Sequence, residues 1–306
     1  MRILFAGTPE LVIPSLNWIA SSEHELVGIL TRPAAAQGRS SVLIDSPAAE
    51  FAKNNSINLY TSIDDLTSEN LLSSVDLVIV IAYGQIIPNA LLGIPKNGWI
   101  NVHFSLLPKY RGAAPVQRAI WNGEKISGIS IFQLDAGMDT GPLYLQKTVS
   151  IDEVQTAGEC LEMMSHLVPD LLSETLIKIR NLEKPTPQDN SDSTLAPKIN
   201  KSESRINWSE SAISIRNMVR ALNPSPRAKS TFRDSEVFFY EVKVSDMKSV
   251  KASGTISFEN QRLFAATNDF DIEIVKIQSS GKNLMSGPEW FRGIQAKDDQ
   301  LEIKYV

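Results

Sequence analysis

The chain has 306 residues, of which 42% are hydrophobic and 21% are charged. This composition is typical of a globular protein and excludes a disordered, collagen-like or coiled-coil chain. At about 150 residues per domain, the length predicts two domains. The longest uninterrupted apolar run, residues 77–82, is far shorter than the ~20 residues that span a bilayer, so no membrane partner is expected.

The cysteine content and the N-terminal residues indicate in which cellular compartment the protein is expected. The lone cysteine, Cys160, excludes an intrachain disulfide and a thiolate-rich zinc site. The first residues lack the long apolar core and the cleavage site of a secretory signal. We therefore expect a cytoplasmic protein, and because no residues cluster with the spacing of metal ligands, we expect no metal.

The net charge of −5 is unevenly distributed along the chain. Residues 1–199 hold 14 Lys or Arg and 21 Asp or Glu, which leaves −7, whereas residues 200–306 hold 16 and 14, which leaves +2. An anionic partner would therefore meet the C-terminal part more favourably. The alternative is that so small an excess is ordinary scatter.

The N-terminal part alternates strand-like and helix-like stretches. Strands are predicted at 2–7, 26–30, 77–84, 98–104, 129–134 and 143–149, and helices at 10–21, 48–54, 115–121 and 157–180. This alternation predicts the α/β class, with a Rossmann-like, doubly wound and mostly parallel sheet. Residues 32–47 have no apolar period and are predicted to form an extended loop.

The composition changes near residue 182. Residues 185–194 are polar and rich in helix and strand breakers, which indicates a linker. After a predicted helix at 209–222, short strand-like runs follow at regular spacing, as in a small β-barrel of the OB-like kind. These runs are 237–244, 254–259, 262–267, 270–278 and 301–306. We therefore divide the chain into a domain at 1–183, a linker at 184–205 and a second domain at 206–306.

Chemistry in such a sheet is expected at the C-terminal ends of the strands. The turn after the first strand, residues 7–9, lacks the spacing of a dinucleotide-binding loop and reads as a plain turn. Asn101 and His103 are two residues apart near the end of a predicted strand, so their side chains point to the same face. The other two histidines, His24 and His166, are expected to be structural.

Two long motifs follow this strand end, FSLLPKYRGAAPVQRAIWNG at 104–123 and LDAGMDTG at 134–141. Together with Asn101 and His103 they resemble the folate-dependent formyltransferase family, and the resemblance covers nearly the whole chain. It implies that Asn101, His103 and Asp139 are the catalytic residues. It also implies that 10-formyltetrahydrofolate is the co-substrate. The residues implied to lie beside the folate are Ser105, Leu106, Leu107, Pro108, Ala82, Tyr83 and Gly84.

Within this family the run AAPVQRAIW, and the similarity of residues 206–226 and 279–290, resemble the branch that formylates methionyl-initiator tRNA. The resemblance implies a bacterial translation-initiation enzyme, expected to act as a monomer. The basic residues that we expect to bind tRNA are Arg39, Lys198, Lys201 and Arg205. Ser40 and Ser41 depart from the basic residues common in this branch, which predicts a changed grip of that loop on tRNA.

The chemistry explains why such residues are needed. A neutral amine attacks the formyl carbon, and the oxyanion that forms requires a hydrogen-bond donor, here the Asn101 amide and a His103 ring N–H. Asp139 is expected to raise the pKa of His103 and to assist proton transfer to the leaving nitrogen. Two alternatives remain, a formyltransferase for a nucleotide-linked amino sugar and an inactive RNA- or folate-binding module. The joint presence of all three residues disfavours the inactive module.

Overall fold

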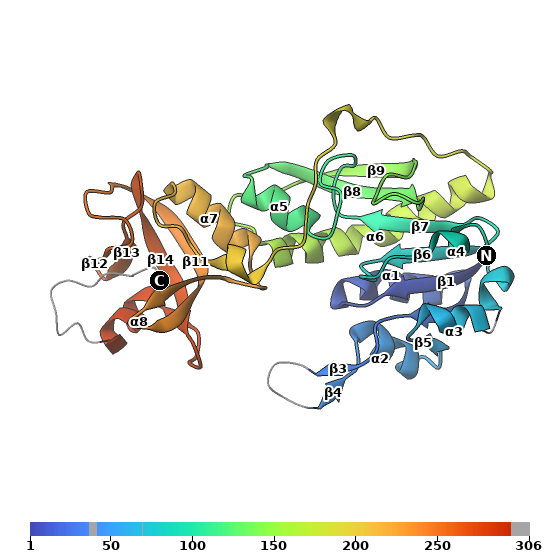
Figure 1. Cartoon of the computed structure of the whole chain (residues 1–306), viewed down its shortest axis with the longest axis horizontal. Coiled ribbons are helices and arrows are strands. Elements are labelled where there is room, and N and C mark those ends of the chain that lie inside the picture. The colour runs from blue at the N-terminus through green and yellow to red at the C-terminus, as the bar shows by residue number, and fades with distance from the viewer. Residues whose placement is uncertain (37–41, 69, 295–306) are drawn as a thin grey trace. The chain divides into compact units, whose positions relative to one another are not determined.

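The computed structural model of the chain describes residues 1–36, 42–68 and 70–294. The described chain forms two compact units. The first unit comprises residues 1–115, 126–150 and 161–197, and the second comprises the rest of the described chain. The first unit contains the whole of the larger sheet, and the second contains the smaller, antiparallel sheet (Figure 1).

The sheet of the first unit has seven strands in the order β5-β2-β1-β6-β7-β8-β9. The first five strands in this order, from β5 to β7, pair in parallel. Strands β8 and β9 continue the sheet in antiparallel pairing. Their bounds are β1 Arg2–Gly7, β2 Glu25–Leu30, β5 Leu59–Tyr60, β6 Leu77–Ile81, β7 Trp99–His103, β8 Ile126–Gln133 and β9 Leu143–Ser150. The order reverses from β1 to β6, as in a doubly wound fold, and the predicted α/β class is confirmed.

The central strands of this sheet are buried because their apolar runs have no polar face. All five residues of β6 and the last five of β1 are buried, which is the pattern of parallel strands covered on both sides. Helices α1 and α2 both contact β2. The first six α-helices, in chain order, are α1 Ile13–Ser21, α2 Pro47–Asn54, α3 Ile63–Ser68, α4 Asn89–Leu92, α5 Pro115–Trp121 and α6 Ala157–Arg180. Single 3-10 turns occur at Glu10–Val12 and Leu71–Ser74.

The extended loop predicted at 32–47 is partly wrong. Two short strands, β3 Ala35–Ala36 and β4 Leu43–Ile44, pair in antiparallel fashion on either side of residues 37–41. Two-residue strands carry no measurable period, so the sequence offered no sign of them. Ser46 then caps α2 by accepting a hydrogen bond from the Ala49 N–H, and Pro47 occupies the first turn.

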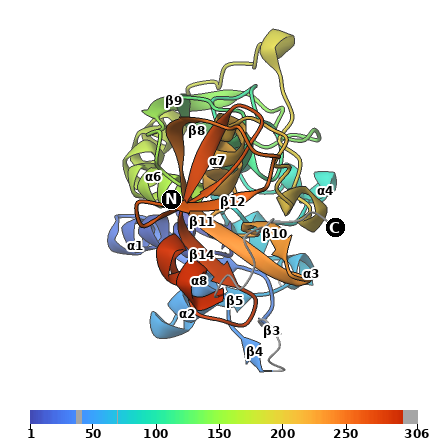
Figure 2. The ribbon, with the colours of Figure 1, turned by 90° about the vertical axis from the view of Figure 1, so that its left-hand side faces the viewer.

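The second unit is built on an antiparallel sheet in the order β10-β11-β14-β13-β12, with β15 paired to β14. Its elements are α7 Ala212–Ala221, β10 Ala228–Phe232, β11 Ser235–Lys248, β12 Ile256–Glu259, β13 Arg262–Ala265, β14 Phe270–Ser279, β15 Met285–Ser286 and α8 Gly287–Ile294. Helices α7 and α8 both pack on β14, and α8 lies beside it in both ribbon views (Figures 1 and 2). The buried core includes Trp208, Phe239 and Trp290. The strand predicted at 301–306 lies outside the described residues.

The polar stretch predicted as a linker makes specific contacts with the first unit. Thr186 and Leu143 exchange backbone hydrogen bonds, and Ala196 bonds the backbone of Arg111. We call residues 186–196 the return segment, which includes a 3-10 turn at Asn190–Asp192. A second 3-10 turn, Lys201–Ser204, follows in the second unit. Composition alone did not indicate these contacts, because polar residues that pack on a neighbouring loop resemble those that meet solvent.

Candidate active site

The candidate site is built around the C-terminal end of β7. Asn101 lies opposite Val80 of β6 and Phe132 of β8, and His103 lies opposite Ser130. As predicted for residues two apart on a strand, both side chains belong to one face of the sheet. His103 is buried, whereas Asn101 is half-buried and its amide bonds no other described residue. Both N–H groups of that amide are therefore available to a substrate.

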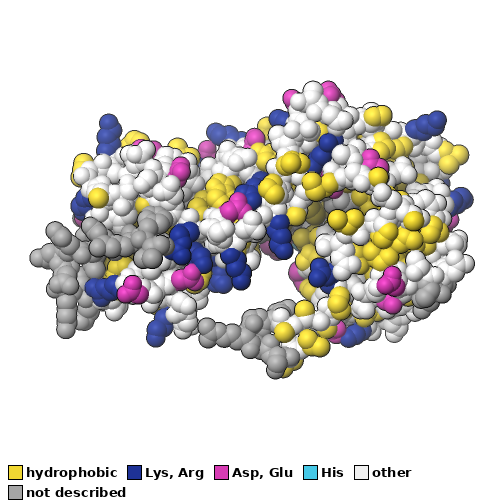
Figure 3. All heavy atoms as spheres, in the orientation of Figure 1, with side chains coloured by type: hydrophobic (Ala, Val, Ile, Leu, Met, Phe, Trp, Pro, Cys, Tyr) yellow, Lys and Arg dark blue, Asp and Glu magenta, His cyan; other side chains and the backbone are white. Residues whose placement is uncertain are grey.

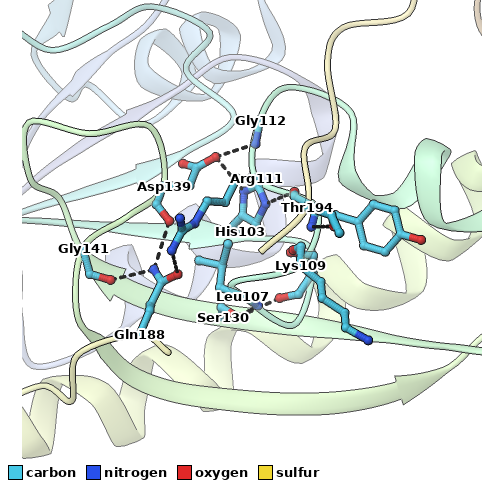
Figure 4. Close-up of polar contacts among 12 residues, drawn as sticks. His103, Leu107, Lys109, Arg111, Gly112, Ser130, Asp139, Gly141, Gln188 and Thr194 are labelled. Carbon is cyan, nitrogen blue, oxygen red and sulfur yellow. Dashed lines mark hydrogen bonds and ion pairs between the residues drawn. The ribbon is translucent and has the colours of Figure 1, made fainter. Parts of the chain in front are cut away.

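His103 is held through one ring nitrogen and faces a carboxylate with the other (Figure 4). Its Nε2 lies 2.9 Å from the carbonyl oxygen of Tyr110. A carbonyl can only accept, so Nε2 carries the proton of a neutral ring and Nδ1 carries the lone pair. Nδ1 lies 3.7 Å from Oδ2 of Asp139. This arrangement leaves Nδ1 as the reactive position of the imidazole.

The protonation state of His103 differs from the sequence-based expectation. Burial lowers its pKa below the ordinary value, and this outweighs both the Asp139 carboxylate and the Tyr110 contact, which raise it. Asp139 does raise the pKa of His103 as expected, but it does not favour a protonated ring overall, because desolvation is the larger effect. At neutral pH the ring is uncharged, so Nδ1 is a proton acceptor, and the ring N–H expected to meet an oxyanion is already bonded to Tyr110.

Asp139 lies in the loop between β8 and β9, where its backbone is left-handed with φ 54°. Its Oδ2 accepts a hydrogen bond of 2.8 Å from the Gly112 N–H. Gly112 itself has φ +123°, and a Cβ there would lie 2.7 Å from the carbonyl oxygen of Ala196. Only glycine meets both demands, which explains why Gly follows Arg at this point of the motif.

The loop at 105–108 is fixed by polar contacts beneath it. The Ser105 hydroxyl donates to the Lys109 carbonyl at 2.6 Å, and the Ser130 hydroxyl links the Ser105 carbonyl to the Leu107 N–H. Gln146 of β9 donates to the Leu107 carbonyl at 2.8 Å. Ser105 and Leu107 are buried, whereas Leu106 and Pro108 are half-buried. Of these four loop residues, which are among the seven predicted beside the folate, Leu106 and Pro108 therefore have side chains that a ligand can reach.

The segment at 82–84 follows directly on β6, one strand away from His103. Ala82 and Gly84 are exposed and both have positive φ, 48° and 79°. Tyr83 between them is buried, and its hydroxyl donates to Gln85 Oε1 at 3.0 Å. Burial raises the pKa of the Tyr83 hydroxyl. This segment therefore presents backbone rather than a large side chain to a ligand.

The sequence did not indicate that four residues near the site, Arg111, Gln188, Asn190 and Thr194, lie together. Arg111 is buried and donates to Gln188 Oε1 at 2.5 Å and Asn190 Oδ1 at 2.7 Å. Thr194 accepts the Tyr110 N–H at its hydroxyl, at 2.8 Å. These partners are about eighty residues apart in the chain, and no local pattern connects them.

Two family models match the chain. Residues 1–176 match the model described as formyl transferase, and residues 198–295 match that described as formyl transferase, C-terminal domain. This chain belongs to the formyl transferase family. Methionyl-tRNA formyltransferases of Salinispora tropica and Carboxydothermus hydrogenoformans are each 37% identical to this formyl transferase, over 96% of the chain and 97% and 96% of their own lengths.

Solved structures share the fold of this formyl transferase. Methionyl-tRNA formyltransferase from Clostridium thermocellum matches with a TM-score of 0.60 and 18% identity, over 94% of this chain and all of that one. The sugar 3N-formyl transferase WlaRD matches with 0.68 and 21%, over 92% and 99%. HypX from Aquifex aeolicus, solved with tetrahydrofolic acid, matches with 0.69 and 17%; this chain spans about half of it, 49%.

Three of the four basic residues predicted to bind tRNA belong to the second unit. Arg39 lies outside the described residues. Lys198 and Lys201 are exposed residues at the start of the second unit's main segment. Arg205 is half-buried and donates to Thr231 Oγ1 at 3.0 Å. Figure 3 shows further Lys and Arg side chains on the visible face of this unit, interspersed with acidic ones.

Over 1–36, 42–68 and 70–294, no three His, Cys, Asp or Glu side chains gather in a way that would hold a metal ion. No helix within these same ranges is both long and apolar enough to cross a membrane.

Proposed function

We propose that this formyl transferase moves the formyl group of 10-formyltetrahydrofolate to the α-amino group of methionyl-initiator tRNA. The observation that carries the proposal is the His103–Asp139 pair, with Nε2 held by the Tyr110 carbonyl and Nδ1 3.7 Å from the carboxylate. The identity of 37% to methionyl-tRNA formyltransferases across nearly the whole chain supports the choice of acceptor.

Asn101 and His103 have different roles in the transfer, one toward the oxyanion and the other toward the proton. The neutral amine attacks the formyl carbon, and the Asn101 amide donates to the oxyanion that develops there. His103 Nδ1 accepts the proton that the attacking amine loses. Asp139 stabilises the imidazolium while it exists, because the two groups lie 3.7 Å apart in a largely buried place.

The same proton completes the reaction. His103 returns it to N10 of the folate as the bond between N10 and the formyl carbon breaks. The products are the N-formylated amine and tetrahydrofolate, and the ring is neutral again. No covalent intermediate on the protein is needed, because the amine itself attacks the formyl carbon.

The residues present fit a folate co-substrate. The Asn101 amide, at the strand end, has no bonding partner in the described part of the chain and can donate to a ligand. Leu106 and Pro108, a few residues further along the chain, offer apolar surface. Residues 82–84 supply exposed backbone for hydrogen bonds to a heterocycle. We assign Ser105 and Leu107 the role of supporting this loop from beneath.

The tRNA is assigned to the basic residues Arg39, Lys198, Lys201 and Arg205. Binding of a polyanion depends on Lys and Arg that release counterions, and the N-terminal part of the chain is acidic. The second unit is therefore assigned most of the affinity for tRNA. We propose that the enzyme acts as a monomer in the bacterial cytoplasm.

The deciding experiment offers the purified protein 10-formyltetrahydrofolate together with charged initiator tRNA or a panel of nucleotide-linked amino sugars. We expect formyl-methionyl-tRNA, and a loss of about 10²-fold or more in kcat for His103→Ala. Formylation of an amino sugar without turnover of the tRNA would contradict the proposed acceptor. Absence of any formylated product would support the inactive binding module instead.

A further inference from the structure

Gln188, in the return segment, uses its whole side-chain amide to join two parts of the site (Figure 4). Its Nε2 donates to the backbone carbonyls of Asp139 at 2.9 Å and Gly141 at 2.7 Å. Its Oε1 accepts from the Arg111 guanidinium at 2.5 Å. A carbonyl can only accept a hydrogen bond and a guanidinium can only donate one. Therefore only one of the two possible orientations of the Gln188 amide satisfies all three contacts.

These contacts hold Asp139 by its backbone and not by its carboxylate. Gln188 holds the backbone carbonyl of Asp139, while the Gly112 N–H holds Oδ2. The backbone of Asp139 has φ 54°, a conformation that residues other than glycine keep only when their surroundings hold them there. The Gln188 and Gly112 contacts both restrain Asp139, whose carboxylate must lie close to His103. Loss of the Gln188 amide would remove the first of these restraints.

The anchor of Gln188 is itself immobilised. The side chain of Arg111 is only 8% exposed, and a second bond of 2.7 Å joins it to Asn190 Oδ1. Its backbone donates to the Thr194 carbonyl and accepts from the Ala196 N–H. Within the part of the chain that the structure describes, the side chain of Arg111 bonds only neutral amide oxygens. Its buried charge therefore depends on Gln188 and Asn190 for compensation.

We propose that Gln188 is a positioning residue for formyl transfer, which sets the place of Asp139 relative to His103 by tying the Asp139 loop to Arg111. The proposal rests on the proposed function, in which Asp139 stabilises the charged form of His103. Gln188 touches neither reactive group directly: it bonds the backbone of Asp139, not the carboxylate, so its effect must pass through the loop.

The first test compares Gln188→Ala and Gln188→Glu in the full-length protein. The Glu side chain still accepts from Arg111 but cannot donate to the carbonyls of Asp139 and Gly141, so it breaks the links to the Asp139 loop and keeps the link to Arg111. Both variants are expected to lower kcat about 10- to 100-fold, the range for a misplaced catalytic group, with both KM values within about twofold of wild type. The control is Asp189→Ala, since the side chain of this exposed neighbour bonds, among the described residues, only the backbone and side chain of Ser191.

The second test combines Gln188→Ala with Asp139→Asn in a double-mutant cycle. If Gln188 acts through Asp139, the double variant is expected to be no slower than Asp139→Asn alone. Multiplication of the two losses would overturn the proposal, because it would show that Gln188 acts by another route. Thermal melting of each variant separates a loss of folded protein from a loss of turnover per folded molecule.

The outcomes also distinguish this proposal from the proposed function. If the wild-type protein forms no product with any acceptor, the proposed function fails and the role of Gln188 fails with it. If the wild-type protein is active while Gln188→Ala and Gln188→Glu keep its kcat, or lose only substrate affinity, the positioning role alone is refuted.

Discussion

Replacing Asp139 with asparagine would remove the charge beside His103 while leaving the shape of the loop. Asparagine tolerates the left-handed backbone found here, and its Oδ1 can still accept from the Gly112 N–H. The variant is therefore expected to fold with little change in melting temperature. What it loses is the carboxylate 3.7 Å from Nδ1 of His103.

The size of the effect follows from that distance. Two unit charges 3.7 Å apart interact by about 4.5 kcal/mol at an effective dielectric constant near 20, and both side chains are less than one-sixth exposed. If the imidazolium is fully formed in the transition state, this energy corresponds to about 10³-fold in rate. Because the asparagine dipole compensates part of the loss, we expect kcat to fall about 10²- to 10³-fold.

The pH dependence gives a second and independent measure. His103 acts as a base, so the rate falls as the pH drops through its pKa. The Asp139 charge raises that pKa against the larger lowering by burial, and its removal lowers the pKa further. The part of the acid limb that His103 controls should therefore move to lower pH in Asp139→Asn.

The assay is single-turnover formylation of charged initiator tRNA across a pH series, with wild type and variant offered the same substrate. Titration of the substrate amine then affects both profiles equally, and their difference reports the enzyme. Asp135→Asn is the matched control, because Asp135 lies in the same loop and, among the residues that the structure describes, its side chain bonds only Gly137 and Thr140. Near-normal turnover of Asp139→Asn, or an acid limb shifted to higher pH, would refute the role given to the pair.

Four further changes have defined expectations. Gly112→Ala should lower the melting temperature, by a destabilisation of about 1–3 kcal/mol, because its φ of +123° and the Ala196 carbonyl both oppose a side chain; calorimetry checks this. Asn101→Ala should lower kcat about 10²-fold in steady-state assays, and Asn101→Asp more, because it places a negative charge beside the oxyanion. Cys160→Ser should keep full activity, since burial raises the pKa of the thiol to about 11; inactivation of the folded wild type by a thiol reagent would contradict this. Lys198→Ala combined with Lys201→Ala should raise KM for tRNA and flatten its salt dependence, and an unchanged salt slope would exclude them as phosphate contacts.

The parts of the site that could be predicted are those governed by local pattern. The alternation of strand residues places Asn101 and His103 on one face, and the long motif after them carries the family resemblance. The protonation of His103 could not be predicted, because its burial depends on elements far away in the chain. Gln188 was equally hidden: it meets Asp139 across 49 residues, and its polar neighbours resemble those of any solvated linker.

The return segment also bears on where this protein can be divided. A fragment that ends at residue 183 keeps every residue of the formyltransferase motif, yet it lacks Gln188, Asn190 and Thr194. Its loss of activity would then reflect a loosened Asp139 loop as well as missing tRNA contacts. A cut or a graft after Pro197 spares the return segment. In chimaeras that exchange C-terminal domains among relatives, the donor of residues 186–196 should therefore be the donor of the catalytic loops.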